Sequence, residues 1–327
     1  MSSRRCSYRA QVLALVALAA PAGAANLPGW EDTPFLKQVV SRAAGKHRHV
    51  LVLVERGLCD GCREMRRALV SLGASDAFER ARYDAAAGEG RDVARRYNVV
   101  VFPTLLLLGP DAVERDRVTG PMSAALLARR VEAIRAGRDT LDRLDRRAAR
   151  RPSDLKLALR VGTGWALRGE RAPAERHLRR VIEGDPDNRR GLAAPALRAL
   201  GDVLHARSLG RHAEAARELG TLVKRFPRAA DARKALPGLA LALARSGRTP
   251  AALALLVKRA ADAEGHARVA RFTLELGVHE ALGLEHARRA TALAPRRASL
   301  WELQARLLQR LGRHGEAREA WKRVEGL

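Results

Sequence analysis

Residues 49–70 read HVLVLVERGLCDGCREMRRALV, and this stretch decides how the first part of the chain folds. The apolar run from His49 to Val54 is typical of a buried strand, and the run from Arg63 to Val70 is typical of a helix. Cys59 and Cys62 lie at the junction, where unpaired N–H groups at the helix N-terminus stabilise a thiolate. The arrangement favours redox chemistry over packing.

The residues around this stretch alternate between short strands and helices. We expect a helix from Trp30 to Val40 before it. After it we expect strands at 81–84, 98–102, 104–108 and 114–118, helices at 90–97 and 123–136, and a turn at 109–111. This alternation predicts an α/β layer fold.

Three motifs resemble those of one family. Cys59-Asp60-Gly61-Cys62, Phe102-Pro103-Thr104 and Gly120 resemble the active-site pair, the cis-proline loop and the late glycine of the thioredoxin superfamily. The intervals from Cys59 to Pro103 and from Pro103 to Gly120, 44 and 17 residues, are also similar. The resemblance covers roughly residues 30–137 and implies a thioredoxin-like domain, placed at 26–137. It also implies that Pro103 is cis and packs against the cysteines.

Each residue of the site has an expected role. Thiol–disulfide exchange needs an exposed attacking thiol, expected at Cys59, and a less exposed resolving thiol, expected at Cys62. By resemblance, Pro103 presents the backbone of Phe102 to an extended substrate segment, as in strand addition. Thr104 belongs to the same substrate-binding loop.

Two acidic residues are candidate modulators of the cysteines. The carboxylate of Asp60 opposes thiolate formation at Cys59, which biases the pair toward a reductant, and Arg63 and Arg66 partly counter it. Glu55 shares a strand face with Leu53 and could accept a proton from Cys62. An exposed position near the strand end is nevertheless the expected one for Glu55.

Two other chemistries stay open for the pair. His47 and His49 could supply nitrogen ligands to a zinc or copper site, although the chain has no second CxxC and the spacing suits no common site. A structural disulfide is the other alternative, although a bond that closes so short a loop removes little conformational entropy from the unfolded chain. We expect no metal and no cofactor, and the chain has no glycine-rich phosphate loop and no GxGxxG motif.

From about residue 138 the pattern changes to repeated helix pairs. Small residues recur at Ala174, Ala215, Ala252 and Ala317, with spacings of 41, 37 and 65 residues, and the last interval contains a degenerate unit. These irregular multiples of a period near ~34 resemble tetratricopeptide (TPR) repeats. The resemblance implies an all-α solenoid with a concave face. We expect a helical connector at 138–152 and the repeats at 153–327, with generic helical hairpins as the alternative.

Residues 1–25 are expected to form a secretory signal peptide. Basic residues at Arg4, Arg5 and Arg9 precede an apolar stretch from Ala10 to Ala20, and small residues for cleavage follow. Its removal would also remove Cys6, the third cysteine. The alternative is an uncleaved membrane anchor, but the stretch is too short to span a bilayer. We therefore expect a periplasmic protein, in a compartment that permits disulfides.

The positive charge is concentrated in the second half. The whole chain carries +25, residues 26–137 contain 18 basic and 14 acidic side chains, and residues 138–327 carry +18. Such a surface attracts acidic proteins, anionic lipid or nucleic acid. Outside the cytoplasm we expect no nucleic-acid partner. A scattered arginine-rich composition without a specific partner is the alternative.

These features predict a periplasmic thiol–disulfide oxidoreductase that acts as a reductase. Its TPR-like repeats would select a client protein with a disulfide or thiols, or an electron-donating partner. If the pair is kept reduced, a membrane donor would have to supply the electrons. The alternative is a TPR adaptor or chaperone-like binding protein whose dithiol is incidental or regulatory. The presence of both cysteines together with the proline loop favours the enzyme.

Overall fold

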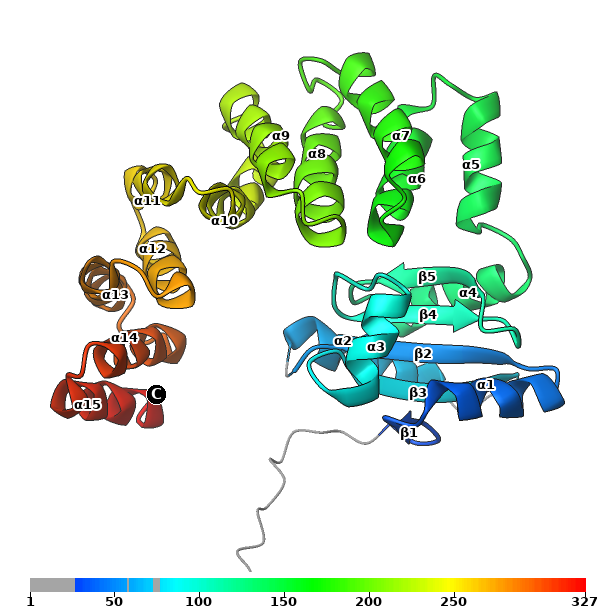
Figure 1. Ribbon diagram of the computed structural model, residues 1–327, viewed down its shortest axis with the longest axis horizontal. Helices are drawn as coiled ribbons and strands as arrows, with labels where there is room; N and C mark the ends of the chain where they lie inside the picture. The colour runs from blue at the N-terminus through cyan, green and yellow to red at the C-terminus, as the bar shows by residue number, and fades with distance from the viewer. Residues whose placement is uncertain (1–26, 58, 73–76) are drawn as a thin grey trace, which may run out of the picture.

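The computed structural model describes residues 27–57, 59–72 and 77–327. The predicted signal peptide at residues 1–25 lies outside this range. Figure 1 shows a small sheet flanked by helices, followed by a long curved row of helices. The α/β part and the all-helical part were both expected. The exact boundaries predicted between them, at 137, 152 and 153, stay predictions.

The described part of the α/β region contains a five-stranded mixed sheet in the order β1-β3-β2-β4-β5. The strands are β1 Glu31–Asp32, β2 His49–Glu55, β3 Phe78–Asp84, β4 Thr104–Leu108 and β5 Glu114–Thr119. β1, β3 and β2 run parallel, whereas β4 runs antiparallel to both β2 and β5. The predicted strand at 49–54 is confirmed, and it is the central strand of the sheet.

Helices cover both faces of the sheet. Leu51 and Leu53 of β2 pack with α2 (Asp60–Leu72) and α4 (Ala124–Arg135). Val50, Val52 and Val54 point to the other face and pack with α1 (Leu36–Gly45) and α3 (Gly88–Arg96). A strand buried on both faces has no polar alternation, which explains the continuous apolar run in the sequence. Strand β2 ends at Glu55, four residues before Cys59.

The helix predicted from Trp30 to Val40 is wrong in its first half. Residues Glu31–Asp32 form the short edge strand β1, and α1 begins only at Leu36. Thr33 has a positive φ of 51° and precedes Pro34. A residue before proline is disfavoured in the helical conformation, so the helix starts after it.

The strand predicted at 98–102 is also wrong. The N–H of Val99 donates to the carbonyl of Ala94 at 2.7 Å, so this residue closes the C-terminus of α3 instead of joining the sheet. Asn98 adopts a positive φ of 46° in the same turn. The remaining residues form a loop up to the cis bond between Phe102 and Pro103, and β4 begins at Thr104.

The second part is a solenoid of helix pairs, introduced by the helix α5 Leu141–Arg150. Its elements are α6 Leu155–Arg168, α7 Arg171–Gly184, α8 Ala193–Arg198, the π-helical segment η1 Ala199–Ser208, α9 His212–Arg225, α10 Ala230–Arg245, α11 Thr249–Lys258, α12 Ala263–Leu276, α13 Glu280–Leu293, α14 Ala298–Arg310 and α15 His314–Glu325. The predicted helical repeats are confirmed. No helix within the described ranges combines the length and apolarity needed to cross a membrane.

Small residues bring the paired helices close together. Ala174, Ala215, Ala252 and Ala317, the residues that defined the repeat, are all buried. At Gly162 of α6 a Cβ would lie only 2.7 Å from Cγ of Leu178 on α7. These positions therefore need a minimal side chain, and their spacing in the sequence reports the stacking of the pairs.

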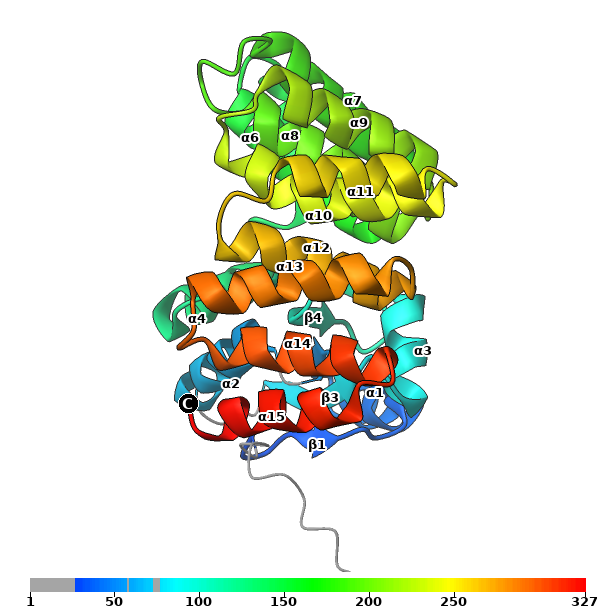
Figure 2. The same cartoon turned by 90° about the vertical axis from the view of Figure 1, so that its left-hand side faces the viewer.

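The solenoid starts against β5 and then arches over one end of the sheet (Figure 1). Arg168 at the end of α6 bonds Asp116 at 2.6 Å and Glu114 at 2.7 Å, and Arg117 donates to the carbonyl of Leu167 at 3.0 Å. In the perpendicular view of Figure 2, α12 to α15 lie in front of the α/β part. The concave side of the arch consequently faces the sheet end that carries the cysteines.

Candidate functional site

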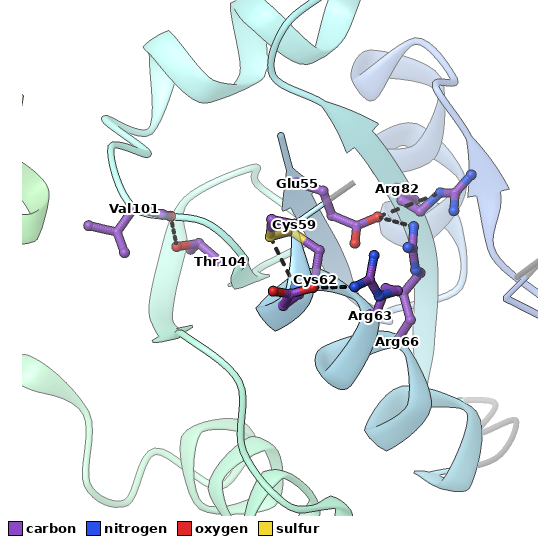
Figure 3. The surroundings of a disulfide bond; sticks show 9 residues. Glu55, Cys59, Cys62, Arg63, Arg66, Arg82, Val101 and Thr104 are labelled. Atoms are coloured by element: carbon purple, nitrogen blue, oxygen red, sulfur yellow. Dashed lines mark hydrogen bonds and ion pairs between the residues drawn. A yellow bond between two sulfur atoms is a disulfide. The ribbon is translucent and has the colours of Figure 1, made fainter. Parts of the chain in front are cut away.

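The two cysteines form a disulfide at the junction of β2 and α2 (Figure 3). The backbone N–H of Cys62 donates to Sγ of Cys59 at 3.0 Å, so the first sulfur receives a hydrogen bond from the first turn of the helix. Cys62 is fully buried, whereas Cys59 is partly exposed. This asymmetry is the one expected for an attacking Cys59 and a resolving Cys62, whose roles stay predictions.

The proline loop lies against the cysteine pair. The Phe102–Pro103 bond is cis, as predicted. Gly61, between the cysteines, is so close to two prolines that a Cβ there would lie 3.4 Å from Cδ of Pro103 and 3.3 Å from Cδ of Pro121. Pro103 therefore packs against the residue between the two cysteines, and Pro121 is a neighbour that the sequence did not reveal.

The two residues beside Pro103 have different environments. Thr104 is buried, and its hydroxyl donates to the carbonyl of Val101 at 2.8 Å, which holds the loop in shape. Phe102 is partly buried against the apolar cluster under α3. Within the described residues the backbone N–H and carbonyl of Phe102 have no hydrogen-bond partner. They can therefore pair with an extended segment, the role predicted for Phe102.

Glu55 is buried, with 5% of its surface exposed, so the expectation of an exposed side chain is wrong. Its Oε2 lies 3.4 Å from Nη1 of Arg66 and 4.0 Å from Nε of Arg82. Within the described residues its Oε1 has no hydrogen-bond partner. Figure 3 shows the Glu55 side chain beside the disulfide, directed toward Arg66 and Arg82.

Burial dominates the electrostatics of this carboxyl. Desolvation raises the pKa of Glu55 above its usual range, and Arg66 and Arg82 oppose the rise only in part. A buried carboxyl with a raised pKa, beside the disulfide in Figure 3, has the property required of a proton acceptor, the second role considered for Glu55. Arg66 is paired with Glu55, and its predicted role in countering Asp60 stays a prediction.

Asp60 lies on the solvent side of the helix start. Its carboxylate is exposed and pairs with Arg63, three residues further along α2. Arg63 was expected to counter Asp60 in part, and this ion pair reduces the charge that Asp60 presents to Cys59. His49, proposed as an alternative metal ligand, begins β2 and lies at the opposite end of this seven-residue strand from the cysteines. The separation of about 20 Å prevents it from sharing a metal with them.

A cleft of about 880 Å³ lies between the proline loop and the concave face of the solenoid. Its walls include Arg56 and Phe102 from the α/β part and residues of η1, α10 and α12 from the solenoid. The sequence located neither the cleft nor the solenoid residues in it. The only signal was the excess of positive charge after residue 138.

No family model and no curated protein matches the chain. Among solved structures, the chain is similar to a crystal structure of MamA, with 18% identity and a TM-score of 0.39 over 52% of this chain and 89% of that one. It is also similar to MamA 41-end from Desulfovibrio magneticus RS-1, with 19% identity and a TM-score of 0.39 over 53% and 94%. At these TM-scores the likeness is a general one, and the function proposed below rests on the residues of this chain.

Proposed function

We propose that the protein is a thiol–disulfide oxidoreductase with a thioredoxin-like domain, acting as a reductase on protein clients that its helical repeats hold. The observation that carries the proposal is the partly exposed Cys59 and the buried Cys62 at the start of α2, with Gly61 between them against cis-Pro103. A CxxC pair at a strand-to-helix junction within a parallel β-α-β unit supports the thioredoxin-like assignment.

The proposed reaction has two exchanges. The Cys59 thiolate attacks one sulfur of a client disulfide, which forms a mixed disulfide and releases one client thiolate. The thiolate of Cys62 then attacks Sγ of Cys59, which releases the second client thiolate and leaves the Cys59–Cys62 disulfide. Glu55 takes the proton from Cys62 as it becomes nucleophilic. A dithiol donor must then return two electrons and two protons.

The proposal includes a location outside the cytoplasm. It rests on the basic and apolar pattern of residues 1–25, and a disulfide-permitting compartment agrees with the oxidised pair. The donor would then be a membrane protein that carries electrons from the cytoplasm.

Reduction of a disulfide-containing protein in the presence of a dithiol reductant tests the activity. Cys59→Ser should abolish it, because the attacking thiolate is lost. Cys62→Ser should accumulate a mixed disulfide with the client, visible as a shifted band that a reductant removes. Full activity of Cys59→Ser would show that the assigned nucleophile is wrong.

An adaptor is the second candidate, and the cleft favours it, since most of its walls come from the solenoid. In that case the repeats bind a partner and the dithiol is incidental or regulatory. The double variant Cys59→Ser/Cys62→Ser separates the two functions in a deletion strain. Restoration of growth or phenotype by this variant would support the adaptor, and failure despite normal protein levels would support the oxidoreductase.

A further inference from the structure

The cleft joins two parts of the chain that are distant in sequence. On one side lie Val99, Val100 and Phe102, the loop that leads to cis-Pro103. On the other side lie α10 and α12 of the solenoid. A polypeptide in the cleft would therefore touch the loop beside the cysteines and the concave face of the repeats at once.

The loop offers an unpaired backbone to such a guest. Among the described residues, the N–H groups of Val100, Val101 and Phe102 have no hydrogen-bond partner. The carbonyls of Val100 and Phe102 have none either, within the same ranges. Extended peptides bind through unpaired backbone of this kind by adding a strand. This favours a guest in extended form.

The solenoid side offers positive charge. Seven basic and three acidic side chains line the cleft in the described part of the chain. Two of the acids are already neutralised, Asp202 by Arg207 at 3.0 Å and Glu264 by Arg271. Five cations have no ion-pair partner within the described residues, namely Arg56, Arg233, Lys234, Arg245 and Arg268. The unmatched charge attracts an anionic guest.

We propose that the cleft binds an acidic, extended segment of the client protein, with its backbone on the Val100–Phe102 loop and its carboxylates on the cations of α10 and α12. The inference deepens the proposed function and relies on it only for what happens to the client at Cys59. Binding itself requires no redox chemistry. Charge complementarity then selects the client and steers it to Cys59.

Binding of fluorescent peptides to the full chain tests the proposal. Three peptides of equal length are compared, one rich in glutamate, one with glutamine in its place and one with lysine in its place. The acidic peptide should bind at least about tenfold more tightly than the glutamine peptide, and added salt should reduce the difference. Equal affinities of the acidic and glutamine peptides would overturn the proposal.

Charge reversal locates the binding in the cleft. Arg233→Glu/Lys234→Glu should lose at least about tenfold in affinity for the acidic peptide and gain affinity for the lysine peptide. The gain shows that the variant still folds. The matched control is Arg217→Glu/Arg318→Glu, because both arginines are exposed solenoid residues outside the cleft, without an ion-pair partner in the described ranges. Equal losses in both variants would overturn the assignment to the cleft.

Two further arms separate the remaining outcomes. A single-stranded oligonucleotide that competes as well as the acidic peptide would show a general polyanion surface and overturn the peptide assignment. Acidic-peptide binding by a protein that reduces no disulfide would refute the proposed oxidoreductase and leave the cleft proposal standing. Disulfide reduction with no preference for acidic segments would overturn the cleft proposal and leave the proposed oxidoreductase standing.

Discussion

At the scale of single residues, two carboxyl groups near the cysteines differ in solvent exposure and in their arginine partners. Asp60 is exposed and paired with Arg63, whereas Glu55 is buried beside the disulfide and faces two arginines. The two acids are both close to the cysteines in sequence. They differ in solvation, so we expect them to affect the cysteines in different ways.

Replacement of Asp60 by asparagine should make the Cys59 thiolate form at lower pH. The substitution removes an opposing charge and leaves Arg63 unpaired near the helix start, and both changes favour the thiolate. An absorbance titration of the thiolate in reduced Cys62→Ser, with and without Asp60→Asn, measures the effect. Glu64→Gln is the control, because Glu64 is exposed and lies in the same turn of α2. A thiolate that forms at the same or higher pH would show that Asp60 does not act on the sulfur.

Glu55 should make stability depend on pH just above the ordinary glutamate range. Its folded-state pKa is raised by burial, so its contribution is fully present below the unfolded pKa and is lost as pH rises through the folded pKa. Glu55→Gln should remove this decline, whose slope is at most about 1.4 kcal/mol per pH unit for one proton. Urea unfolding of both proteins at several pH values tests it, and parallel curves would contradict it.

Arg66, the ion-pair partner of Glu55, provides a matched test of the same buried pair. Arg66→Met should destabilise the fold at neutral pH by about 3–5 kcal/mol, because it leaves a buried carboxylate with less compensation. The double variant Glu55→Gln/Arg66→Met should recover part of this loss. If Arg66→Met is harmless on its own, Glu55 is already protonated at neutral pH.

At the scale of elements, close contacts between helices define the solenoid. Gly162→Ala on α6 should cost about 1–3 kcal/mol, because its Cβ would collide with Leu178 of the paired helix. Gly220→Ala on α9 is the control, since a Cβ there meets nothing within 4 Å. It should instead stabilise the protein by about 0.5–1 kcal/mol. Thermal unfolding of both variants measures the two changes, and equal shifts of the melting temperature would contradict the packing argument.

Elements with one strong local pattern could be predicted from the sequence. The apolar run of β2, the cysteine junction and the small residues of the repeats each reflect a single physical requirement. The loop at 98–102 could not be predicted, because its valines have high strand propensity, whereas the turn that closes α3, with the positive φ of Asn98 and the bond from Val99 to Ala94, takes them out of the sheet.

The burial of Glu55 left one weak signal in the sequence. Arg66 follows Cys62 by four residues, so it occupies the inner face of α2, where an arginine needs a buried acid. The cleft left no local signal at all. Arg56 and Arg233 are 177 positions apart and meet only because the solenoid curves.

At the scale of the whole molecule, we expect the two parts to divide the work. Residues 26–137 alone should retain activity on a small generic disulfide but lose preference for the native client, since the solenoid side of the cleft is absent. Residues 153–327 should fold alone, because stacked repeats bury their own core, and should bind the client in a salt-sensitive way. Activity assays and binding measurements on both fragments and the full chain decide this. Full restoration of a deletion strain by 153–327 alone would support the adaptor.

The arch of helices over the proline loop also orders events in time. A client and an electron donor would each have to bring a sulfur atom to the same partly exposed Cys59, beside the loop that forms one wall of the cleft. Because Cys59 exchanges with one sulfur at a time, the two proteins have to react with it in turn. The protein would therefore react alternately with client and donor. Double-reciprocal plots of rate against client concentration, measured at several donor concentrations, should be parallel lines. An excess of either client or donor should slow turnover, because it keeps the other protein from Cys59.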